Sequence, residues 1–249
     1  MIELQDVSQV FDNGIETIQV LNSINLAIPE GQFVTVIGGN GAGKSTLFNI
    51  ICGNLRPTSG SVFIEGRDVL RKSRSTRAAM VACVFQNPNA GVCPDLTIAE
   101  NMAIAYSRGK TRGLQWAIRK KDLAFFAEKL AEFDLGLENM LRKKAALLSG
   151  GQRQVVTLLM ATLQKPMLLL LDEHTAALDP RIAKQVMGIT KRLVDEQKIT
   201  TVMISHNMGD AIAYGDRLLM LNRGDIVMDV SGEEKQALTR AELLTKFEI

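Results

Sequence analysis

The chain has 249 residues, of which 46% are hydrophobic and 22% charged, with 29 basic residues against 27 acidic ones. A chain of this length and composition buries a sizeable core, which excludes a disordered or fibrous protein. The near balance of charge offers no global electrostatic attraction to nucleic acid, and the length allows one large domain or two small ones.

The N-terminal part of the chain has the pattern of β structure. Apolar and β-branched residues alternate with polar ones, which predicts strands at residues 2–7, 18–28 and 33–38. Residues 29–31, Pro-Glu-Gly, form a turn between the last two strands. A further short strand is predicted at residues 61–65, after the turn at 57–60.

The pattern changes to a helical period between about residues 97 and 164. In one part of this segment apolar residues recur every three or four positions, with charged residues between them. The apolar residues of this stripe are Leu123, Phe126, Ala127, Leu130 and Phe133. The stripe predicts a helix packed on a core of its own.

Strands and helices alternate after residue 166. Residues 167–171 are a continuous apolar run, as in a strand buried on both faces. Pro180 suits the first turn of a helix that runs to about Gln197. The remaining expected elements are a strand at 200–205, shorter elements at 217–222 and 225–230, and a final packed helix at 239–249. The expected fold is α/β, with a buried βαβ core interrupted by a mostly helical insert near 89–164.

Residues 38–45 fit the phosphate-loop (Walker A) pattern G-x-x-x-x-G-K-[ST] without a mismatch, between an apolar strand and a helix-compatible run that starts at Thr46. Glycines let the backbone N–H groups turn toward phosphate oxygens, and the helix N-terminus adds the positive end of its dipole. We expect Lys44 to reach the β and γ phosphates, and the Ser45 hydroxyl to ligate Mg²⁺. The loop residues are Gly38, Gly39, Asn40, Gly41, Ala42, Gly43, Lys44 and Ser45.

Two adjacent carboxylates, Asp172 and Glu173, follow the buried strand at 167–171. Open α/β sheets bind ligands at the carboxyl ends of their strands. Successive side chains at a strand end point in different directions, so the two can act separately. We assign Asp172 to the Mg²⁺ shell and Glu173 to the attacking water, from which it takes a proton.

A second loop rich in serine and glycine, Leu148-Ser149-Gly150-Gly151-Gln152, precedes a helix-compatible run from Arg153. Taken alone, this loop is either a second anion cradle or an ordinary helix N-cap with flexible glycines.

The motifs occur in a family-specific order. The phosphate loop, Gln86, the Ser149 loop, the Asp172-Glu173 strand, Ala177-Leu178-Asp179 and His206 follow one another as in the nucleotide-binding subunits of ABC transporters, which this chain resembles over essentially its whole length. The resemblance implies a single ABC ATPase domain over residues 1–249, a P-loop NTPase fold with a RecA-like core, an N-terminal antiparallel β subdomain and a helical insert. Residues 1–88 and 165–249 would form the core with the β subdomain, and 89–164 the helical subdomain that carries the Ser149 loop.

The resemblance also implies roles for single residues. Phe11 is similar to the aromatic residue that stacks on adenine, where the family more often has Tyr. Gln86 resembles the glutamine that touches Mg²⁺ and water and senses the membrane partner. His206 is similar to the histidine that contacts the γ-phosphate and orients the attack, and Asp179 to the aspartate that crosses a dimer interface. Ser149, Gly150 and Gly151 would contact the γ-phosphate held by the other protomer.

The expected site residues fall into three groups. The catalytic group is Glu173, His206, Lys44 and Gln86. The Mg²⁺ ligands are Ser45, Gln86 and Asp172. The residues expected to bind ATP are Phe11, Gly38, Gly39, Asn40, Gly41, Ala42, Gly43, Lys44, Ser45, Thr46, Ser149, Gly150, Gly151, Gln152 and Asp179.

The chain departs from the family pattern after Glu173. Most relatives have Pro-Thr there, whereas this chain has His174-Thr175. An imidazole can titrate near neutrality. His174 is therefore either a tolerated replacement at the start of a loop or a residue that tunes hydrolysis.

The sequence has neither the run of about 18 apolar residues that a membrane span needs nor a signal-peptide pattern. Its three scattered cysteines indicate a reducing compartment rather than a disulfide framework. We expect the protein at the cytoplasmic face of the cell membrane, docked on a permease through residues 87–92. The basic stretch that follows is either a solvated face or lies near anionic lipid headgroups or the permease; it comprises Arg108, Lys110, Arg112, Arg119, Lys120 and Lys121.

The expected function is the ATP-hydrolysing motor of a bacterial ABC transporter. ATP would close a head-to-tail homodimer, and loss of the bridging γ-phosphate would open it. The sequence favours import over export, and it is similar to a bacterial subset paired with extracytoplasmic lipoprotein-type binding proteins for aromatic amino acids. One alternative is a soluble ABC ATPase of Fe–S cluster assembly or DNA maintenance, and another is an inactive scaffold. No nucleic-acid partner is expected.

Overall fold

The computed structural model describes residues 1–110 and 118–247 of the chain. Their contacts divide the chain into two compact units. The first unit comprises Met1–Val81, Met167–Glu173 and Lys198–Ile249, and the second Ala82–Pro166 and His174–Gln197. The second unit is thus larger than the insert expected at 89–164, because it also includes the helix that starts at Pro180.

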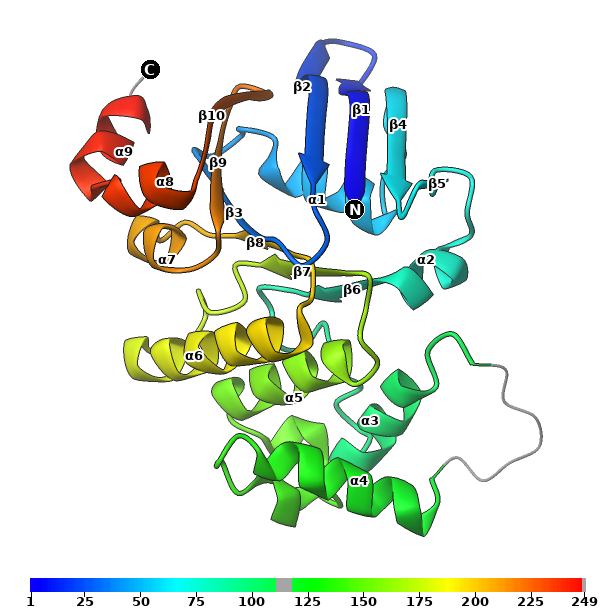
Figure 1. The fold of residues 1–249 in the computed structure, drawn as a ribbon. Coiled ribbons are helices and arrows are strands. Elements are labelled where there is room, and N and C mark those ends of the chain that lie inside the picture. The colour runs from blue at the N-terminus through cyan, green and yellow to red at the C-terminus, as the bar shows by residue number, and fades with distance from the viewer. Residues whose placement is uncertain (111–117, 248–249) are drawn as a thin grey trace. The chain divides into compact units, whose positions relative to one another are not determined.

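The first unit contains an antiparallel sheet with the strand order β2-β1-β4-β5 (Figure 1). Its strands are β1 (Ile2–Asp12), β2 (Thr17–Ile28), β4 (Ser59–Ile64) and β5 (Arg67–Asp68). The predicted first strand ended at residue 7, but β1 continues to Asp12. Asp6 has a φ of 50°, and the pairing of β1 with β2 shifts register between Leu4 and Val7. These irregularities break the alternation of buried and exposed side chains, and the strand predicted from that alternation therefore ended too early.

A second sheet of the first unit is mostly parallel and runs in the order β10-β9-β3-β8-β7. Strands β3, β7, β8 and β9 are parallel to one another, whereas β10 is antiparallel to β9. Every residue of β3 is buried. The carboxyl ends of β3, β7 and β8 therefore meet at one edge of the sheet. The strand bounds are β3 (Phe33–Gly38), β7 (Leu168–Asp172), β8 (Thr201–Ile204), β9 (Arg217–Asn222) and β10 (Asp225–Ser231).

The helices of the first unit are α1 (Lys44–Cys52), α2 (Arg74–Met80), α7 (Met208–Ala213), α8 (Gly232–Ala237) and α9 (Arg240–Phe247). The expected C-terminal helix is present as α9, and its Leu243 is fully buried in an apolar cluster with Ile37 and Met220. Helix α2 was missed because its residues are largely polar. It is held instead by a Ser73 N-cap and by Arg77, which is 4% exposed and donates to the carbonyls of Ile50 and Val69.

The second unit is mainly helical. It contains β6 (Val81–Val84), which starts at the boundary between the units, and the helices α3 (Ile98–Tyr106), α4 (Lys120–Ala131), α5 (Gly150–Thr162) and α6 (Pro180–Gln197), with short 3-10 turns at Leu137–Met140 and Ala145–Leu147. Phe126, Leu130 and Phe133 of the predicted apolar stripe are buried, which confirms a helix packed on its own core. Helices α5 and α6 pack together (Figure 1). In the part of the chain that the structure describes, no helix has the length and apolar character that crossing a membrane requires.

Candidate active site

The phosphate loop joins the end of β3 to the start of α1, as its sequence predicts. Gly43, the N-cap of α1, has a φ of 101°, a left-handed conformation that favours glycine. A Cβ atom on Gly43 would lie 2.7 Å from Cδ2 of Leu21 and 2.8 Å from the carbonyl oxygen of Val20. Glycine is therefore needed both for the turn and for the close approach of the loop to β2.

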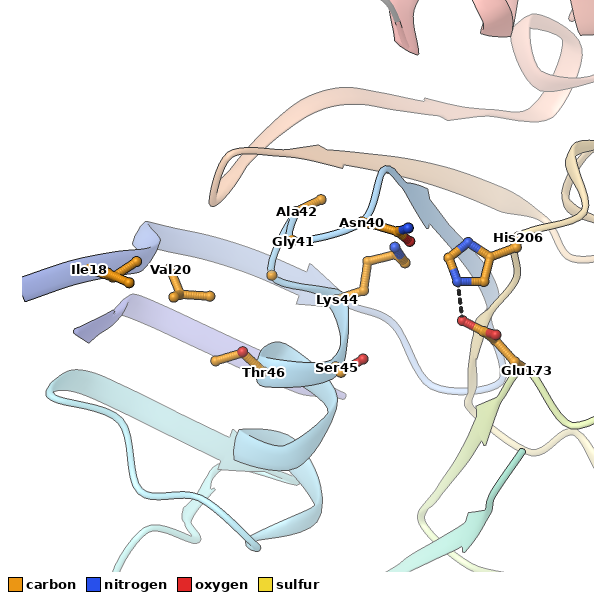
Figure 2. Close-up of a pocket in the computed structure, with 11 residues that line it drawn as sticks. Ile18, Val20, Asn40, Gly41, Ala42, Lys44, Ser45, Thr46, Glu173 and His206 are labelled. Carbon is orange, nitrogen blue, oxygen red and sulfur yellow. Dashed lines mark ion pairs between the residues drawn. The ribbon is translucent and has the colours of Figure 1, made fainter. Parts of the chain in front are cut away.

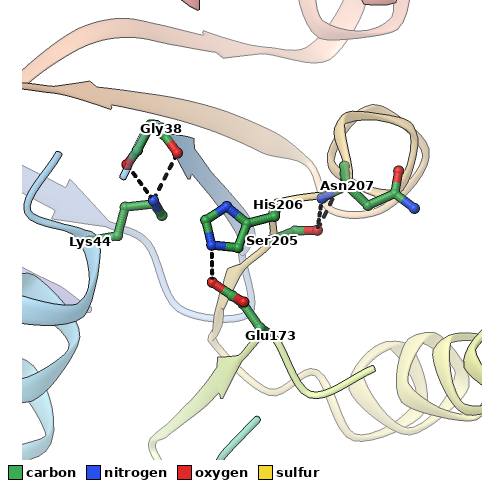
Figure 3. A network of polar contacts seen from close by, with 7 residues as sticks. Gly38, Lys44, Glu173, Ser205, His206 and Asn207 are labelled. Carbon is green, nitrogen blue, oxygen red and sulfur yellow. Dashed lines mark hydrogen bonds and ion pairs between the residues drawn. The ribbon is translucent and has the colours of Figure 1, made fainter. Parts of the chain in front are cut away.

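Lys44 is the first residue of α1, and its side chain is folded into the loop. It is 5% exposed, and its Nζ donates to the carbonyl oxygens of Gly38 and Gly39 at 2.8 Å each (Figure 3). Burial lowers the pKa of Lys44, while the carboxylates of Glu173 and Asp172 act in the opposite direction. A buried ammonium group inside a loop of backbone N–H groups is well placed to bind an anion.

A cavity of about 360 Å³ opens at this edge of the sheet (Figure 2). It is lined by Ile18, Val20, the loop from Asn40 to Thr46, Glu173 and His206. Ile18 and Val20 of β2 form an apolar wall, and Lys44, Glu173 and His206 lie on the polar side (Figure 2). The cavity thus suits a ligand with one apolar part and one anionic part.

Phe11, expected to stack on adenine, is not among the residues that line this cavity. It is 44% exposed, and it pairs directly with Ile18 across β1 and β2. The apolar lining comes instead from Ile18 and Val20, which the sequence analysis missed. Their alternation within a strand looks the same as that of any other strand residue, so the sequence carried no signal for them.

Glu173 and His206 are in direct contact. Glu173 follows β7, His206 follows β8, and Glu173 Oε1 lies 2.5 Å from His206 Nε2 (Figures 2 and 3). The Glu173 side chain is 13% exposed and that of His206 is 49% exposed. Because β7 and β8 are neighbouring parallel strands, the residues that follow them lie at the same edge of the sheet, whereas the sequence analysis gave the two residues separate roles and did not predict their contact.

Asp172, the last residue of β7, is half-buried beside the pair. Burial raises the pKa of Asp172, and the neighbouring Glu173 carboxylate raises it further, against the opposing effects of His206 and Lys44. The site therefore holds two carboxylates in a poorly hydrated place with few compensating cations. Such a site favours the arrival of a cation.

The donors for a divalent cation are hard oxygens. Ser45 presents an exposed hydroxyl in the first turn of α1, and Asp172 presents a carboxylate. Both suit Mg²⁺, which keeps several waters and takes only one or two protein ligands beside substrate phosphates. The described residues contain no group of three or more His, Cys, Asp or Glu that could hold a metal by themselves.

The Ser149 loop forms the N-terminus of α5 in the second unit. The Ser149 hydroxyl accepts from the backbone N–H of Gln152 at 3.2 Å, and the Gln152 side chain accepts from the N–H of Ser149 at 3.2 Å. A Cβ atom on Gly151 would lie 2.3 Å from Cγ2 of Ile182, so this glycine lets α5 and α6 pack closely. Asp179 accepts from the N–H of Ile182 at 3.1 Å in the first turn of α6. Ser149 is therefore the N-cap of α5, and its capping hydrogen bonds hold the loop in place.

Gln86 also belongs to the second unit, where it is exposed two residues after the end of β6. The segment around it is fixed to α5, because Gln154 Nε2 donates to the carbonyl of Phe85 at 3.3 Å and the Arg153 guanidinium donates to Asn89 Oδ1. The structure thus brings Lys44, Asp172, Glu173 and His206 together in the first unit. Gln86, the Ser149 loop and Asp179 are described within the second.

The basic stretch after α3 is only partly a solvated face. The Arg108 guanidinium donates to the carbonyls of Ala161 and Gln164 at 3.0 and 2.8 Å, so the expectation of a free surface cation is wrong for this residue. Arg119 forms an ion pair with Asp122, and Lys110 Nζ lies 3.8 Å from the centre of the Tyr106 ring. Lys120 and Lys121 are exposed, and Arg112 lies outside the described residues.

His174 is 1% exposed, and its Nε2 lies 3.0 Å from Oγ1 of Thr190 in α6. Burial lowers the pKa of His174 to about 4. The expectation that it could titrate near neutrality is therefore wrong, because a charged imidazole would lose its hydration in this place.

The buried imidazole makes stability depend on pH in a defined window. Between pH 6.5 and about 4 the unfolded chain binds a proton at His174 that the folded chain does not bind. This contribution to stability is fully present above pH 6.5 and is lost as pH falls toward 4; the loss is about 2 kcal/mol at pH 5. We expect the free energy of unfolding, measured by urea titration, to fall by about 2 kcal/mol less between pH 7 and 5 in His174→Gln than in the wild type. If the free energy of unfolding of the wild type and of His174→Gln changed equally with pH, a buried neutral imidazole would be contradicted.

Comparison with known proteins places this site in a family. Residues 21–176 match the family model described as ABC transporter. The chain is 41% identical over 251 residues to the tyrosine transport ATP-binding protein of Clostridioides difficile (strain R20291), a match that covers 100% of this chain and 99% of that protein. It is 38% identical over 226 residues to the spermidine/putrescine import ATP-binding protein PotA of Spiroplasma citri, covering 91% of this chain but 60% of the length of PotA.

A solved structure supports the same assignment. An ATP-binding cassette, determined as a dimer in a post-hydrolysis state bound to ADP and phosphate, matches the fold with a TM-score of 0.78 at 31% identity. The match covers 93% of this chain and 98% of that one. The expected fold class, a P-loop NTPase of the ABC type, is thereby confirmed. The family match, the full-length relative and the shared fold agree, and this chain belongs to the ABC transporter family as an ATP-binding subunit.

Proposed function

We propose that this chain binds and hydrolyses Mg²⁺-ATP in the cavity described above and drives an importer for an amino acid, with an aromatic amino acid as the first candidate. The observation that carries the proposal is the grouping of the Lys44 ammonium and the Glu173–His206 pair around one cavity at the carboxyl ends of β3, β7 and β8, with the half-buried Asp172 next to Glu173 at the end of β7. This group has an anion-binding cation, a carboxylate for a metal and a carboxylate for a proton.

Substrate binding uses the two sides of the cavity. The N–H groups of the loop and Lys44 hold the phosphates, and Asn40, Gly41, Ala42 and Thr46 complete the cradle. The base lies against Ile18 and Val20, with the Phe11 ring at the neighbouring position on β1. Because the wall is apolar, it holds the adenine by contact with the faces of the ring, which buries apolar surface.

Hydrolysis uses the polar side of the cavity. Glu173 accepts a proton from the attacking water, and His206, which Glu173 holds through Nε2, contacts the γ-phosphate. Ser45 and Asp172 would hold Mg²⁺, with Gln86 as the further ligand that the family resemblance implies, and the ion would neutralise charge on the phosphates. Desolvation makes Asp172 a better ligand for a cation than a free surface carboxylate, since the cation removes the cost of burying its charge.

The active form is a head-to-tail homodimer in which each nucleotide is shared. The Ser149 hydroxyl accepts a hydrogen bond from its own helix, so its single proton stays available for a γ-phosphate oxygen of the other protomer. Gly150, Gly151 and Gln152 add backbone N–H groups at the N-terminus of α5, and Asp179 crosses the interface. Hydrolysis removes the bridging γ-phosphate, and with it the attraction that closes the dimer.

The chain works at the cytoplasmic face of the membrane, docked on a permease through residues 87–92, with an extracytoplasmic binding protein supplying the substrate. The 41% identity to a tyrosine transport protein over the full length supports an amino acid as cargo. The proposed helical subdomain that carries the Ser149 loop is 89–164.

Uptake assays in a deletion strain test this function. Loss of the gene is expected to abolish the ATP-dependent uptake of radiolabelled tyrosine and to leave spermidine uptake unchanged. The wild-type chain is expected to restore uptake, and Lys44→Ala is not. Loss of spermidine uptake instead would overturn the amino-acid cargo. Normal uptake of both, with the chain recovered free of any permease, would favour a non-transport ATPase.

A further inference from the structure

The residue after the proposed catalytic base is anchored in a helix. His174 is 1% exposed, and its imidazole contacts the hydroxyl of Thr190, which is itself fully buried in α6. The two side chains form one buried polar pair inside the second unit. Nothing in the proposed hydrolysis uses this pair directly.

The hydrogen bonds of Thr190 fix the direction of this contact. Thr190 Oγ1 donates to the carbonyl oxygen of Val186 at 2.9 Å. A hydroxyl has one proton, so Oγ1 has none left for the imidazole and must accept from it. His174 is therefore the neutral tautomer with its proton on Nε2, and this proton is used in the bond to Thr190.

Glu173 itself has a restrained main chain. Its φ of 46° lies in the left-handed region, which costs energy for a residue other than glycine. Its N–H donates to the carbonyl oxygen of Ile204 at 3.1 Å. The main chain of Glu173 is thus fixed on its N-terminal side by β8, and the next residue is fixed by its side chain to α6. Only a few torsion angles separate these two anchors.

We infer that His174 is a positioning residue for hydrolysis: through its bond to Thr190 it holds the main chain at Glu173 in the conformation that directs the carboxylate to His206 and to the attacking water. The inference rests on the proposed role of Glu173 as the base. Catalytic rates are sensitive to displacements of about 1 Å in a reacting group. Nucleotide binding depends on the phosphate loop, of which His174 is not a part.

The test compares two buried threonines in the full-length chain. Thr190→Val removes the acceptor of His174, and it is expected to lower kcat for ATP hydrolysis about tenfold or more while KM for ATP stays unchanged. Thr162→Val is the matched control, because Thr162 is 2% exposed and its hydroxyl donates to the carbonyl of Leu158 at 2.9 Å, with no histidine partner. This control is expected to keep the wild-type kcat.

Rescue at position 174 separates positioning from packing. His174→Gln keeps a neutral N–H donor at the end of the side chain, and it is expected to retain most of the rate that His174→Leu loses. Equal rates for Thr190→Val and Thr162→Val would overturn the inference, as would a loss confined to KM.

The Glu173→Gln background links the effect to the base. Thr190→Val is expected to have no further effect on the residual rate there, because the group that it positions is already disabled. If Glu173→Gln hydrolyses slowly but Thr190→Val keeps the wild-type kcat, only the positioning role fails. If Glu173→Gln is fully active, the proposed base fails and this inference fails with it.

Discussion

Glu173→Gln is expected to hydrolyse ATP at least a hundredfold more slowly than the wild-type chain while its affinity for ATP stays the same. Glutamine has the size of glutamate and keeps an oxygen and a nitrogen near His206, but an amide cannot take a proton from water. Because Glu173 lies beside the phosphate loop but is not part of it, the contacts that hold the nucleotide remain. Steady-state hydrolysis and equilibrium binding of a fluorescent ATP analogue measure the two quantities.

The same variant is expected to accumulate as an ATP-held dimer, visible by light scattering, since the γ-phosphate that bridges the protomers is not removed. Glu30→Gln is the control, because Glu30 is an exposed carboxylate outside the cavity. A Glu173→Gln protein with the hydrolysis rate of Glu30→Gln would refute the assignment of the base. If Glu173→Gln hydrolyses slowly but stays monomeric with ATP, Glu173 remains the base and the shared-nucleotide dimer is contradicted.

The sequence predicted the phosphate loop and the strand end with its carboxylates, because in both the local backbone geometry requires particular residue types. The loop from Gly38 to Ser45 needs glycine at a left-handed position, lysine and a hydroxyl in a fixed order between a strand and a helix. Residues 168–171 need to be apolar because this part of β7 is fully buried, so the carboxylates after it mark a strand end. In both cases the residue types within a short stretch of sequence are enough to determine the local structure.

Other features depend on residues that meet only in the folded chain. Nothing near His174 in the sequence shows that its imidazole will be buried against Thr190 or that this burial will lower its pKa. Arg108 looks like part of a basic surface until the carbonyls of Ala161 and Gln164 are placed beside it. Ile18 and Val20 line the cavity because β2 runs past the phosphate loop, and neither side chain is unusual for a strand. Short-range patterns cannot report such long-range contacts.

Lys44→Ala is expected to lower the affinity for ATP about a hundredfold or more, since it removes a charge-assisted hydrogen-bond donor from a poorly hydrated site. A loss of about 3 kcal/mol, at the upper end for bonds to charged groups, corresponds to about two powers of ten. The fold itself is expected to keep its stability. Burial lowers the pKa of Lys44, so the folded chain bears a desolvation cost that alanine removes, against the loss of two bonds to Gly38 and Gly39.

Thermal unfolding separates these two effects. A ligand that binds the folded chain raises its melting temperature according to its concentration and affinity. The wild type and Lys72→Ala, which changes an exposed lysine outside the cavity, are expected to gain the same stabilisation from ATP. Lys44→Ala is expected to melt close to the wild type without ATP and to gain far less stabilisation than the wild type at ATP concentrations that saturate the wild type. Full ATP-dependent stabilisation of Lys44→Ala would show that the phosphates bind elsewhere, whereas a low melting temperature without ATP would show that the buried ammonium mainly supports the loop through Gly38 and Gly39.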